Sequence, residues 1–176
     1  MRFVETAVAG AYVIEPDPFV DERGIFARTF CAETFAAKGL VDCFVQTNTS
    51  FNPQRGTLRG LHYQVAPKGE AKLVRATRGR LFDVALDLRA DSPTYLAHVA
   101  VELDADRRNA LYVPVGCAHG FLTLTDDCEA FYLVSENYSP EASRAVRWDD
   151  PAFAIAWPAD PQVISPRDAS AEDYAP

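Results

Sequence analysis

The chain has 176 residues, a length that suits one domain with a substantial core and excludes two domains of ordinary size. Its composition of 48% apolar and 24% charged residues is typical of a folded globular protein and excludes a disordered chain. The net charge of −8 argues against nucleic acid or an anionic membrane as a general partner.

Neither the N-terminus nor the cysteines of the sequence carry a recognisable targeting or metal-binding signal. The opening residues MRFVETAVAGAYV lack a basic region followed by an uninterrupted apolar run, and no stretch approaches the roughly 18 apolar residues of a membrane span. We therefore expect a soluble, cytoplasmic protein with no membrane partner. The cysteines form no CxxC pair, which favours buried free thiols over a zinc cluster or a redox dithiol; they are Cys31, Cys43, Cys117 and Cys128.

Taken in chain order, the predicted elements are mostly short strands. One helix is expected from Ala32 to Lys38, closed by Gly39. Apolar residues alternate with other residues over 82–89 and 99–104, which predicts two half-buried antiparallel strands. Turn signals recur at residues 21–24, 52–53, 67–69, 78–79, 91–93, 104–106 and 125–127. Short strands at this spacing predict a β-sandwich or barrel.

The C-terminal part of the sequence adds one more short helical turn. Ser165 is a suitable N-cap and Pro166 a suitable first helical residue. The last ten residues are acidic and rich in alanine, and we expect that they could fray. Because the sequence has no internal repeat, low-complexity tract or linker, we interpret residues 1–176 as one domain.

Basic residues gather in one segment of this acidic chain. Residues 55–80 contain seven lysines and arginines against the single acid Glu70. Such a segment is typical of a site for a small anion such as a phosphate or a nucleotide. A solvated strand face has the same composition, so the segment alone leaves both interpretations open.

Two of the three histidines, His62 and His119, lie in segments that resemble the motifs of the cupin superfamily. The first cupin motif is G-x5-H-x-H-x3–4-E, and GTLRGLHYQ matches it at Gly56 and His62. The second is P-x-G-x2-H-x3-N, and PVGCAHGF matches its proline, glycine and histidine. The resemblance implies an all-β fold, a cupin-type jelly-roll barrel with a few short helices. The third histidine, His98, is expected at the surface.

The metal-ligand positions of the first cupin motif are only partly filled. Gln64 stands where the second motif histidine would be, and the acid is displaced to Glu70. A first-row metal prefers three or four well-matched imidazole, carboxylate or thiolate ligands, so we expect no bound metal. An imidazole in a metal-free barrel is suited to moving protons, because the ordinary pKa of histidine, about 6.5, lies near the working pH.

Eight blocks of the sequence resemble, in order and spacing, one metal-free cupin family, the dTDP-4-dehydrorhamnose 3,5-epimerases. The blocks are DERGIF, FVQTNTS, GTLRGLHYQ, KLVRATRGRLFDVALDLRADSPTY, YVPVGCAHGFLTL, FYLVSENYSP, RWDDPAFAIAWP and ISPRDA. Family members take a 4-keto-6-deoxy sugar attached to a nucleoside diphosphate and invert the carbons beside the ketone. The resemblance implies an isomerase without a cofactor, and a homodimer in which the N-terminal strands pair with the partner subunit.

The resemblance also implies four catalytic residues. Such a reaction needs a base, stabilisation of the developing enolate oxygen, and a proton returned from the opposite face. His62 matches the base, and Asp168 matches the carboxylate that orients it. Tyr132 matches the proton donor, and Lys72 the cation near the ketone oxygen. From the sequence, Asp168 also fits the N3 position of a capping box that begins at Ser165, Tyr132 fits a core position, and Lys72 fits an exposed edge strand.

Six further residues match substrate-binding positions of the family: Arg23, Gln46, Asn48, Arg59, His119 and Tyr138. Arg59 is assigned to the diphosphate, which a guanidinium binds in a bidentate manner. Because Arg59 lies three residues before His62, both face one pocket only if a bulge or strand end interrupts the strand near its glycines. Tyr138 is expected on the same strand face as Tyr132 if that strand continues. Arg28 replaces a glutamate of many relatives, which leaves the nucleotide, the sugar and the number of inverted carbons open.

The expected function is epimerisation at carbon 3, carbon 5 or both of dTDP-4-dehydro-6-deoxyglucose or a close analogue. A nucleotide-sugar 3,4-ketoisomerase also works through an enolate, and a non-catalytic cupin would only bind a sugar. The opposed acid Tyr132 favours epimerisation, since moving a ketone does not require a proton from the face opposite the base. A metal-dependent cupin dioxygenase ranks last because the ligand set is incomplete.

Overall fold

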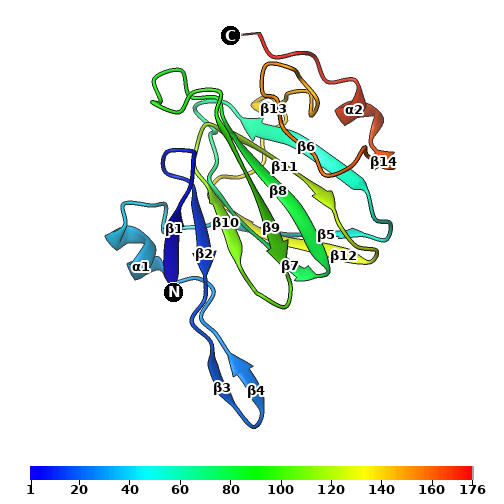
Figure 1. Ribbon diagram of the computed structural model, residues 1–176. Coiled ribbons are helices and arrows are strands. Elements are labelled where there is room, and N and C mark those ends of the chain that lie inside the picture. Colours follow the sequence, from blue (N-terminus) through cyan, green and yellow to red (C-terminus); the bar gives the residue numbers. More distant parts are fainter. Residues whose placement is uncertain (176) are drawn as a thin grey trace.

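The computed structural model describes residues 1–175, which form two facing β-sheets and two short helices (Figure 1). The first sheet contains, in order, β1 (Arg2–Glu5), β2 (Tyr12–Glu15), β10 (Ala110–Val113), β7 (Lys72–Arg78), β12 (Cys128–Val134) and β5 (Gln46–Asn52). The second contains β13 (Ser143–Ala145), β6 (Thr57–Gln64), β11 (Cys117–Thr123), β8 (Arg80–Asp87) and β9 (His98–Asp104), with β14 (Val163–Ile164) parallel to β6. The expected all-β class is confirmed.

Eight of the strands have the order of a jelly roll. They run β5-β12-β7-β10 in the first sheet and β6-β11-β8-β9 in the second, and neighbouring strands are antiparallel. Within residues 1–175 no backbone ladder joins the sheets, so the fold is a two-layer sandwich rather than a closed barrel. A space between two such layers can hold a ligand where polar side chains replace the apolar filling.

The hydrophobic core has one part between the sheets and one part on the outer side of each sheet. Between the sheets, Val74, Leu81, Leu111 and Phe121 are almost completely buried. Outside the first sheet, helix α1 (Ala32–Ala37) inserts Phe35. Outside the second sheet, a C-terminal cluster that includes Val146, Phe153, Trp157 and Tyr174 covers β8 and β11.

Strand β8 departs from the half-buried strand that its alternation predicts. Its apolar face, with Val84 and Leu86, is buried under the C-terminal segment, and its other face is buried between the sheets. That inner face carries two carboxylates, Asp83 and Asp87, which are fully buried. The prediction was wrong because a strand's own alternation does not reveal a distant segment that covers its second face. Strand β9, at the edge of the sheet, is half-buried over most of its length, as predicted.

Both helices lie where the sequence predicts them. Gly39 follows α1 with φ +70°, the left-handed conformation expected of a glycine at this position. Helix α2 (Pro166–Ala169) begins after Ser165, whose hydroxyl accepts a hydrogen bond from the Asp168 N–H. Of the last ten residues, Tyr174 packs on the second sheet and its N–H donates to Asp150, while position 176 lies outside the described residues.

The predictions for the burial of the cysteines and of His98 are confirmed only in part. All four thiols are free, and Cys117 and Cys128 are buried as expected. Burial raises the pKa of Cys117 to about 12 and that of Cys128 to about 11. The expectation of buried thiols is wrong for Cys43, which is exposed, and Cys31 is only partly buried. His98 is partly exposed at the start of β9.

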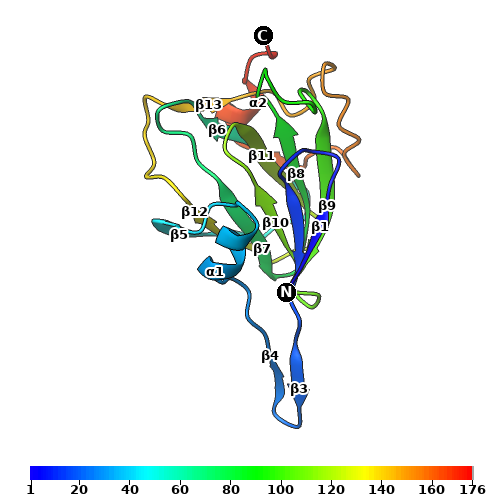
Figure 2. The same cartoon turned by 90° about the vertical axis from the view of Figure 1, so that its left-hand side faces the viewer.

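One hairpin stands apart from the sandwich. Strands β3 (Phe19–Asp21) and β4 (Gly24–Phe26) pair only with each other and project from one end of the molecule (Figures 1 and 2). No helix among residues 1–175 is long and apolar enough to cross a membrane. The cytoplasmic location stays a prediction.

Candidate active site

A cavity of about 690 Å³ lies between the two sheets and is closed on one side by the segment that contains β14 and α2. A smaller cavity of about 250 Å³ shares four lining residues with it, so the two form one cleft. We name them the main cavity and the side cavity. The shared residues come from β6, β7, β12 and α2; they are His62, Lys72, Tyr132 and Arg167.

His62 and Asp168 form a close pair across a long stretch of sequence. The His62 Nε2 lies 2.7 Å from the Asp168 Oδ1, and the other Asp168 oxygen accepts the Gly60 N–H at 3.3 Å. Burial opposes ionisation of Asp168, but the hydrogen bonds from His62, Gly60 and Ser165 lower its pKa below the usual range. An ionised carboxylate on Nε2 keeps the proton there and leaves Nδ1 free to act as a base. Asp168 therefore combines the capping position with the contact to His62.

Arg59 and His62 face the same cavity because β6 is irregular between them. Against β11, His62 pairs with His119 and Arg59 pairs with Phe121, so β6 has one more residue than its partner over this stretch. Gly60, inside the irregularity, has φ +123°, and a Cβ there would lie 2.5 Å from the Gly120 Cα. The bulge expected near the glycines is confirmed. The Arg59 Nε donates to the Asn52 Oδ1 at 2.8 Å, which fixes the guanidinium at the cavity wall.

Tyr132 and Lys72 enter the cleft from the first sheet, opposite His62. Burial raises the pKa of the Tyr132 phenol, the Arg59 guanidinium lowers it and the Glu70 carboxylate raises it, so the phenol is protonated at neutral pH. Lys72 lies on the interior strand β7 rather than on an edge, and its side chain is only 9% exposed. Its Nζ lies 3.1 Å from the Glu70 carboxylate and 3.3 Å from the His62 carbonyl oxygen.

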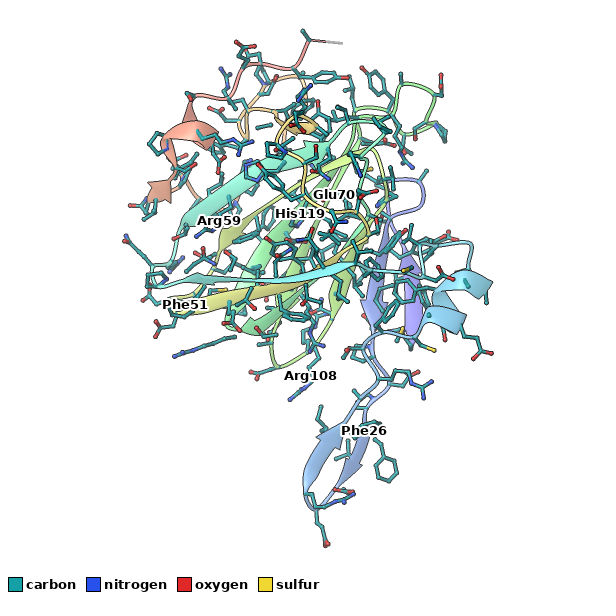
Figure 3. The ribbon with its side chains drawn as sticks, turned by 180° about the vertical axis from the view of Figure 1, so that it is seen from behind. Phe26, Phe51, Arg59, Glu70, Arg108 and His119 are labelled. Carbon is teal, nitrogen blue, oxygen red and sulfur yellow. The ribbon has the colours of Figure 1, made fainter. Side chains whose placement is uncertain are left out.

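The remaining predicted residues of the sandwich divide between the two cavities. His119, labelled in Figure 3, lines the main cavity. Its Nε2 lies 2.9 Å from the fully buried Asp83, whose second oxygen has no partner among residues 1–175. Gln46 and Asn48 line the side cavity. Tyr138 lines it too, but not from the face of β12: that strand ends at Val134, and Tyr138 is 60% exposed in the following loop. The Tyr138 N–H donates to the Gln46 side chain at 2.9 Å.

Comparison with known proteins identifies the family. The family model described as dTDP-4-dehydrorhamnose 3,5-epimerase matches residues 5–175. The chain belongs to the dTDP-4-dehydrorhamnose 3,5-epimerase family. Members of this family are isomerases, and the chain is therefore an enzyme of this class.

Individual members of the epimerase family resemble the chain over nearly its whole length. The Methanothermobacter thermautotrophicus dTDP-4-dehydrorhamnose 3,5-epimerase is 45% identical over 170 residues, which are 95% of this chain and 91% of the relative. The Bacillus anthracis 3,5-epimerase, solved with TDP and pyrophosphate bound, superposes with a TM-score of 0.94 at 37% identity, covering 98% and 99% of the two chains. A Streptomyces niveus dTDP-4-dehydrorhamnose 3-epimerase is 38% identical, with 97% of this chain and 83% of the relative covered.

Arg23 is the one residue of the predicted set that the structure places away from the cleft. It lies on the projecting β3–β4 hairpin, pairs with Asp21 and has a side chain that is 82% exposed. Arg28 is exposed near the base of the hairpin, with its guanidinium 3.9 Å from the Cys31 sulfur. A single chain therefore brings nine of the ten predicted residues to the cleft.

Several residues of the cleft were missed by the analysis of the sequence. Arg167 lines both cavities and Ser143 lines the side cavity, where the Arg167 guanidinium donates to the Ser143 hydroxyl at 3.1 Å. Arg167 directly precedes Asp168, the predicted partner of His62, and a cation next to a predicted site residue was a usable signal. Asp83 gave no such signal, because its pairing with His119 depends on the alignment of β8 with β11.

The two residues at which the sequence departs from the metal motif, Gln64 and Glu70, contact other groups of the protein. The Gln64 amide donates to the Lys68 carbonyl and accepts the Ser139 N–H, at 2.9 and 2.7 Å. Glu70, the displaced acid of the motif, pairs with Lys72. Within residues 1–175 no three histidine, cysteine or acidic side chains gather as a metal site.

Proposed function

We propose that this epimerase inverts carbon 3, carbon 5 or both of a dTDP-linked 4-keto-6-deoxy sugar, with His62 as the base and Tyr132 as the acid. The observation that carries the proposal is their placement. His62 comes from the second sheet and Tyr132 from the first, and both side chains line the same cleft. Inversion needs a base and an acid on opposite faces of the sugar ring, and this arrangement supplies both.

The proposed reaction starts at a carbon next to the ketone. His62 takes the proton, and the electron pair of the C–H bond moves to the ketone oxygen to give an enolate. The Lys72 ammonium stabilises that oxygen, because the lysine side chain is only 9% exposed and a buried positive charge acts more strongly than one in bulk water. Tyr132 then donates its phenolic proton to the opposite face of the same carbon. Asp168 keeps the imidazole in the tautomer that accepts a proton.

The nucleotide part of the substrate is assigned to the basic and polar rim of the cleft. Arg59 and Arg167 supply the positive charge for the diphosphate, and Arg59 is already oriented by Asn52. Gln46 and Asn48 offer amides to the sugar or the base, and the partly exposed Tyr138 ring offers a surface for stacking. His119, fixed by Asp83, faces the sugar end.

The proposed active form is a homodimer in which the hairpin of one chain reaches the cleft of the other. The hairpin exposes apolar residues to an extent that a monomer seldom tolerates, between 42% and 74%; they are Phe19, Val20, Ile25 and Phe26. The same hairpin carries Arg23, which has no place in the cleft of its own chain. In contrast, β1 and β2 extend the first sheet of their own chain.

Proton exchange tests the proposed reaction directly. The protein incubated with dTDP-4-keto-6-deoxyglucose in deuterium oxide should introduce solvent deuterium beside the ketone, at one position or two according to the number of centres inverted. His62→Ala should lose about 10²- to 10⁴-fold of the exchange rate, the usual contribution of a general base. Absence of exchange with every 4-keto sugar on dTDP, GDP and CDP would refute the function.

Tyr132→Phe separates epimerisation from simple enolisation. With His62 intact, this variant should still exchange the proton but return deuterium to the original face, so that substrate is labelled and product formation falls strongly. Mass spectrometry of the recovered sugar and product analysis measure the two effects. A variant that inverts the carbon at the wild-type rate would show that the acid is another group.

A further inference from the structure

Glu70 places a carboxylate in the side cavity, directly beside Lys72, the cation proposed to stabilise the enolate oxygen. The side chains of Glu70 and Lys72 are 12% and 9% exposed, and their charged atoms lie 3.1 Å apart. A surface pair such as Arg80 with Glu102 is far more open, because these side chains are 46% and 41% exposed. Burial of an ion pair costs desolvation energy that mutual attraction seldom repays in full, so stability does not explain this pair.

The contacts of Lys72 show what the carboxylate does there. A lysine ammonium on a flexible four-carbon stem is not held in one place by its own side chain. Here the Nζ has an acceptor on each side, the Glu70 carboxylate at 3.1 Å and the His62 carbonyl oxygen at 3.3 Å. The ammonium is therefore fixed between the Glu70 carboxylate and strand β6, which carries the base, in the cavity that the Tyr132 phenol also lines.

We propose that Glu70 is a positioning residue: its carboxylate fixes the Lys72 ammonium at the ketone subsite and keeps a negative charge near the Tyr132 phenol. The inference rests on the proposed epimerase function. Glu70 does not contact the reacting carbon in this proposal and acts through Lys72 and Tyr132. The negative charge has a consequence of its own, because an anion near a phenol favours the protonated form that a proton donor needs.

The charges around Tyr132 allow this effect to be predicted. Burial raises the pKa of the phenol, Arg59 lowers it and Glu70 raises it. Removal of the Glu70 charge takes away one of the two effects that raise the pKa of Tyr132, while Arg59 still lowers it, so the pKa falls. The charged or titratable groups that face the cleft from the elements around this phenol are Arg59, His62 and Tyr63 of β6, Lys72 of β7 with the preceding Glu70, His119 of β11 with Asp83 of β8, Tyr138 after β12, and Arg167 and Asp168 of α2.

Glu70→Gln tests the proposal, because it removes the charge and keeps the shape. We expect kcat to fall about 10- to 100-fold with KM nearly unchanged, and the alkaline limb of the kcat profile to move to lower pH. Glu70→Asp keeps the charge but does not reach Lys72, so it should lower kcat without moving that limb. Glu136→Gln, which removes the carboxylate of the exposed Lys68 pair, is the matched control and should change neither quantity.

A titration without substrate keeps this test separate from the proposed function. With ¹³C-labelled tyrosine, the Tyr132 signal, assigned with Tyr132→Phe, should titrate at a lower pH in Glu70→Gln than in the wild type. Glu70→Asp should titrate as the wild type does. An unchanged midpoint in Glu70→Gln overturns the role of the charge, and an unchanged kcat overturns the positioning of Lys72, while failure of the epimerase function appears earlier, as a wild type without turnover.

Discussion

At the scale of single residues, the cleft is organised by buried carboxylates that each hold one functional group. Asp168 holds His62, Asp83 holds His119 and Glu70 holds Lys72, at distances between 2.7 and 3.1 Å. Each acid comes from a different part of the chain, and each is at least largely buried. Fixed partners of this kind reduce the reorganisation that a reaction would otherwise require.

Asp168→Asn should affect both catalysis and stability. The imidazole loses the anionic acceptor that sets its tautomer, because the asparagine NH2 group can donate to Nε2 when its oxygen accepts the Gly60 N–H, so kcat should fall at least about 10²-fold. The folded protein lowers the pKa of this carboxyl below its ordinary value of 3.8, so the ionised form stabilises the fold above that pH, and the contribution is lost as the pH falls through the lowered pKa. The variant should be less stable at pH 6 by about 1.5–3 kcal/mol.

Urea unfolding at several pH values measures this effect of Asp168. The difference in free energy of unfolding between wild type and Asp168→Asn should shrink below about pH 4. Asp160→Asn, at an exposed position, should change neither kcat nor stability. A stability difference that does not depend on pH would contradict the assignment of an ionised Asp168.

At the scale of secondary structure elements, the irregularity of β6 determines which side chains share the cleft. In a regular strand, residues three apart lie on opposite faces. The bulge between Arg59 and His62 reverses that relation, and the close approach of Gly60 to Gly120 makes the bulge possible. The shared placement of Arg59 and His62, the proposed phosphate-binding and proton-transfer groups, thus depends on two glycines that have no functional side chain.

Gly60→Ala should therefore damage both the fold and the site. A Cβ at a φ of +123° and 2.5 Å from the Gly120 Cα forces the strands apart, so the free energy of unfolding should fall by about 1–3 kcal/mol or more. The displacement of Arg59 relative to His62 should lower kcat/KM by about 10²-fold. Gly39→Ala is the control: it also changes a positive-φ glycine, but nothing lies within 4 Å of the added Cβ. It should lose about 1–2 kcal/mol and keep its activity.

Urea unfolding and steady-state kinetics of the two glycine variants separate these effects. A Gly60→Ala enzyme with the kcat/KM of Gly39→Ala would show that the bulge does not position the site.

At the scale of the whole molecule, the β3–β4 hairpin leaves an apolar surface of the single chain uncovered. The β3–β4 segment extends away from the sandwich, with an exposed apolar surface that includes Phe26, while Arg59, Glu70 and His119 lie in the body (Figure 3). Burial of that surface on a second chain would follow from the hydrophobic effect. The dimer would then complete each cleft with Arg23 of the other subunit.

A mixture of two inactive variants tests the shared site. Arg23→Ala and His62→Ala, each assayed below the KM of the wild type, should both show low activity. After the two are mixed and subunits exchange, a hybrid dimer contains one cleft with both residues intact, so activity should reappear. No recovery, with exchange verified by mass spectrometry, would show that Arg23 does not act across the dimer.

The sequence by itself determined the class of fold, both helices and the residue types of the cleft. Alternation, glycines and caps are local features, and local geometry follows from them; the positions of α1 and of the Ser165 cap are examples. The need for a bulge near Gly60 was also readable, because the spacing of Arg59 and His62 conflicts with the period of a strand. The roles of the matching residues came from the resemblance to the epimerases.

Only the tertiary structure decided which groups meet. Asp168 reaches His62 across 106 residues, and Glu70 reaches Lys72 rather than a metal, because strand order and register set these contacts. The burial of both faces of β8 depends on a C-terminal segment that its own pattern cannot reveal. Arg23 matches the family motif, yet its side chain is 82% exposed on the hairpin, away from the cleft lined by its own chain. Secondary structure follows from interactions between residues close in the sequence. Tertiary packing depends on many weak contacts between distant segments, which no short segment contains.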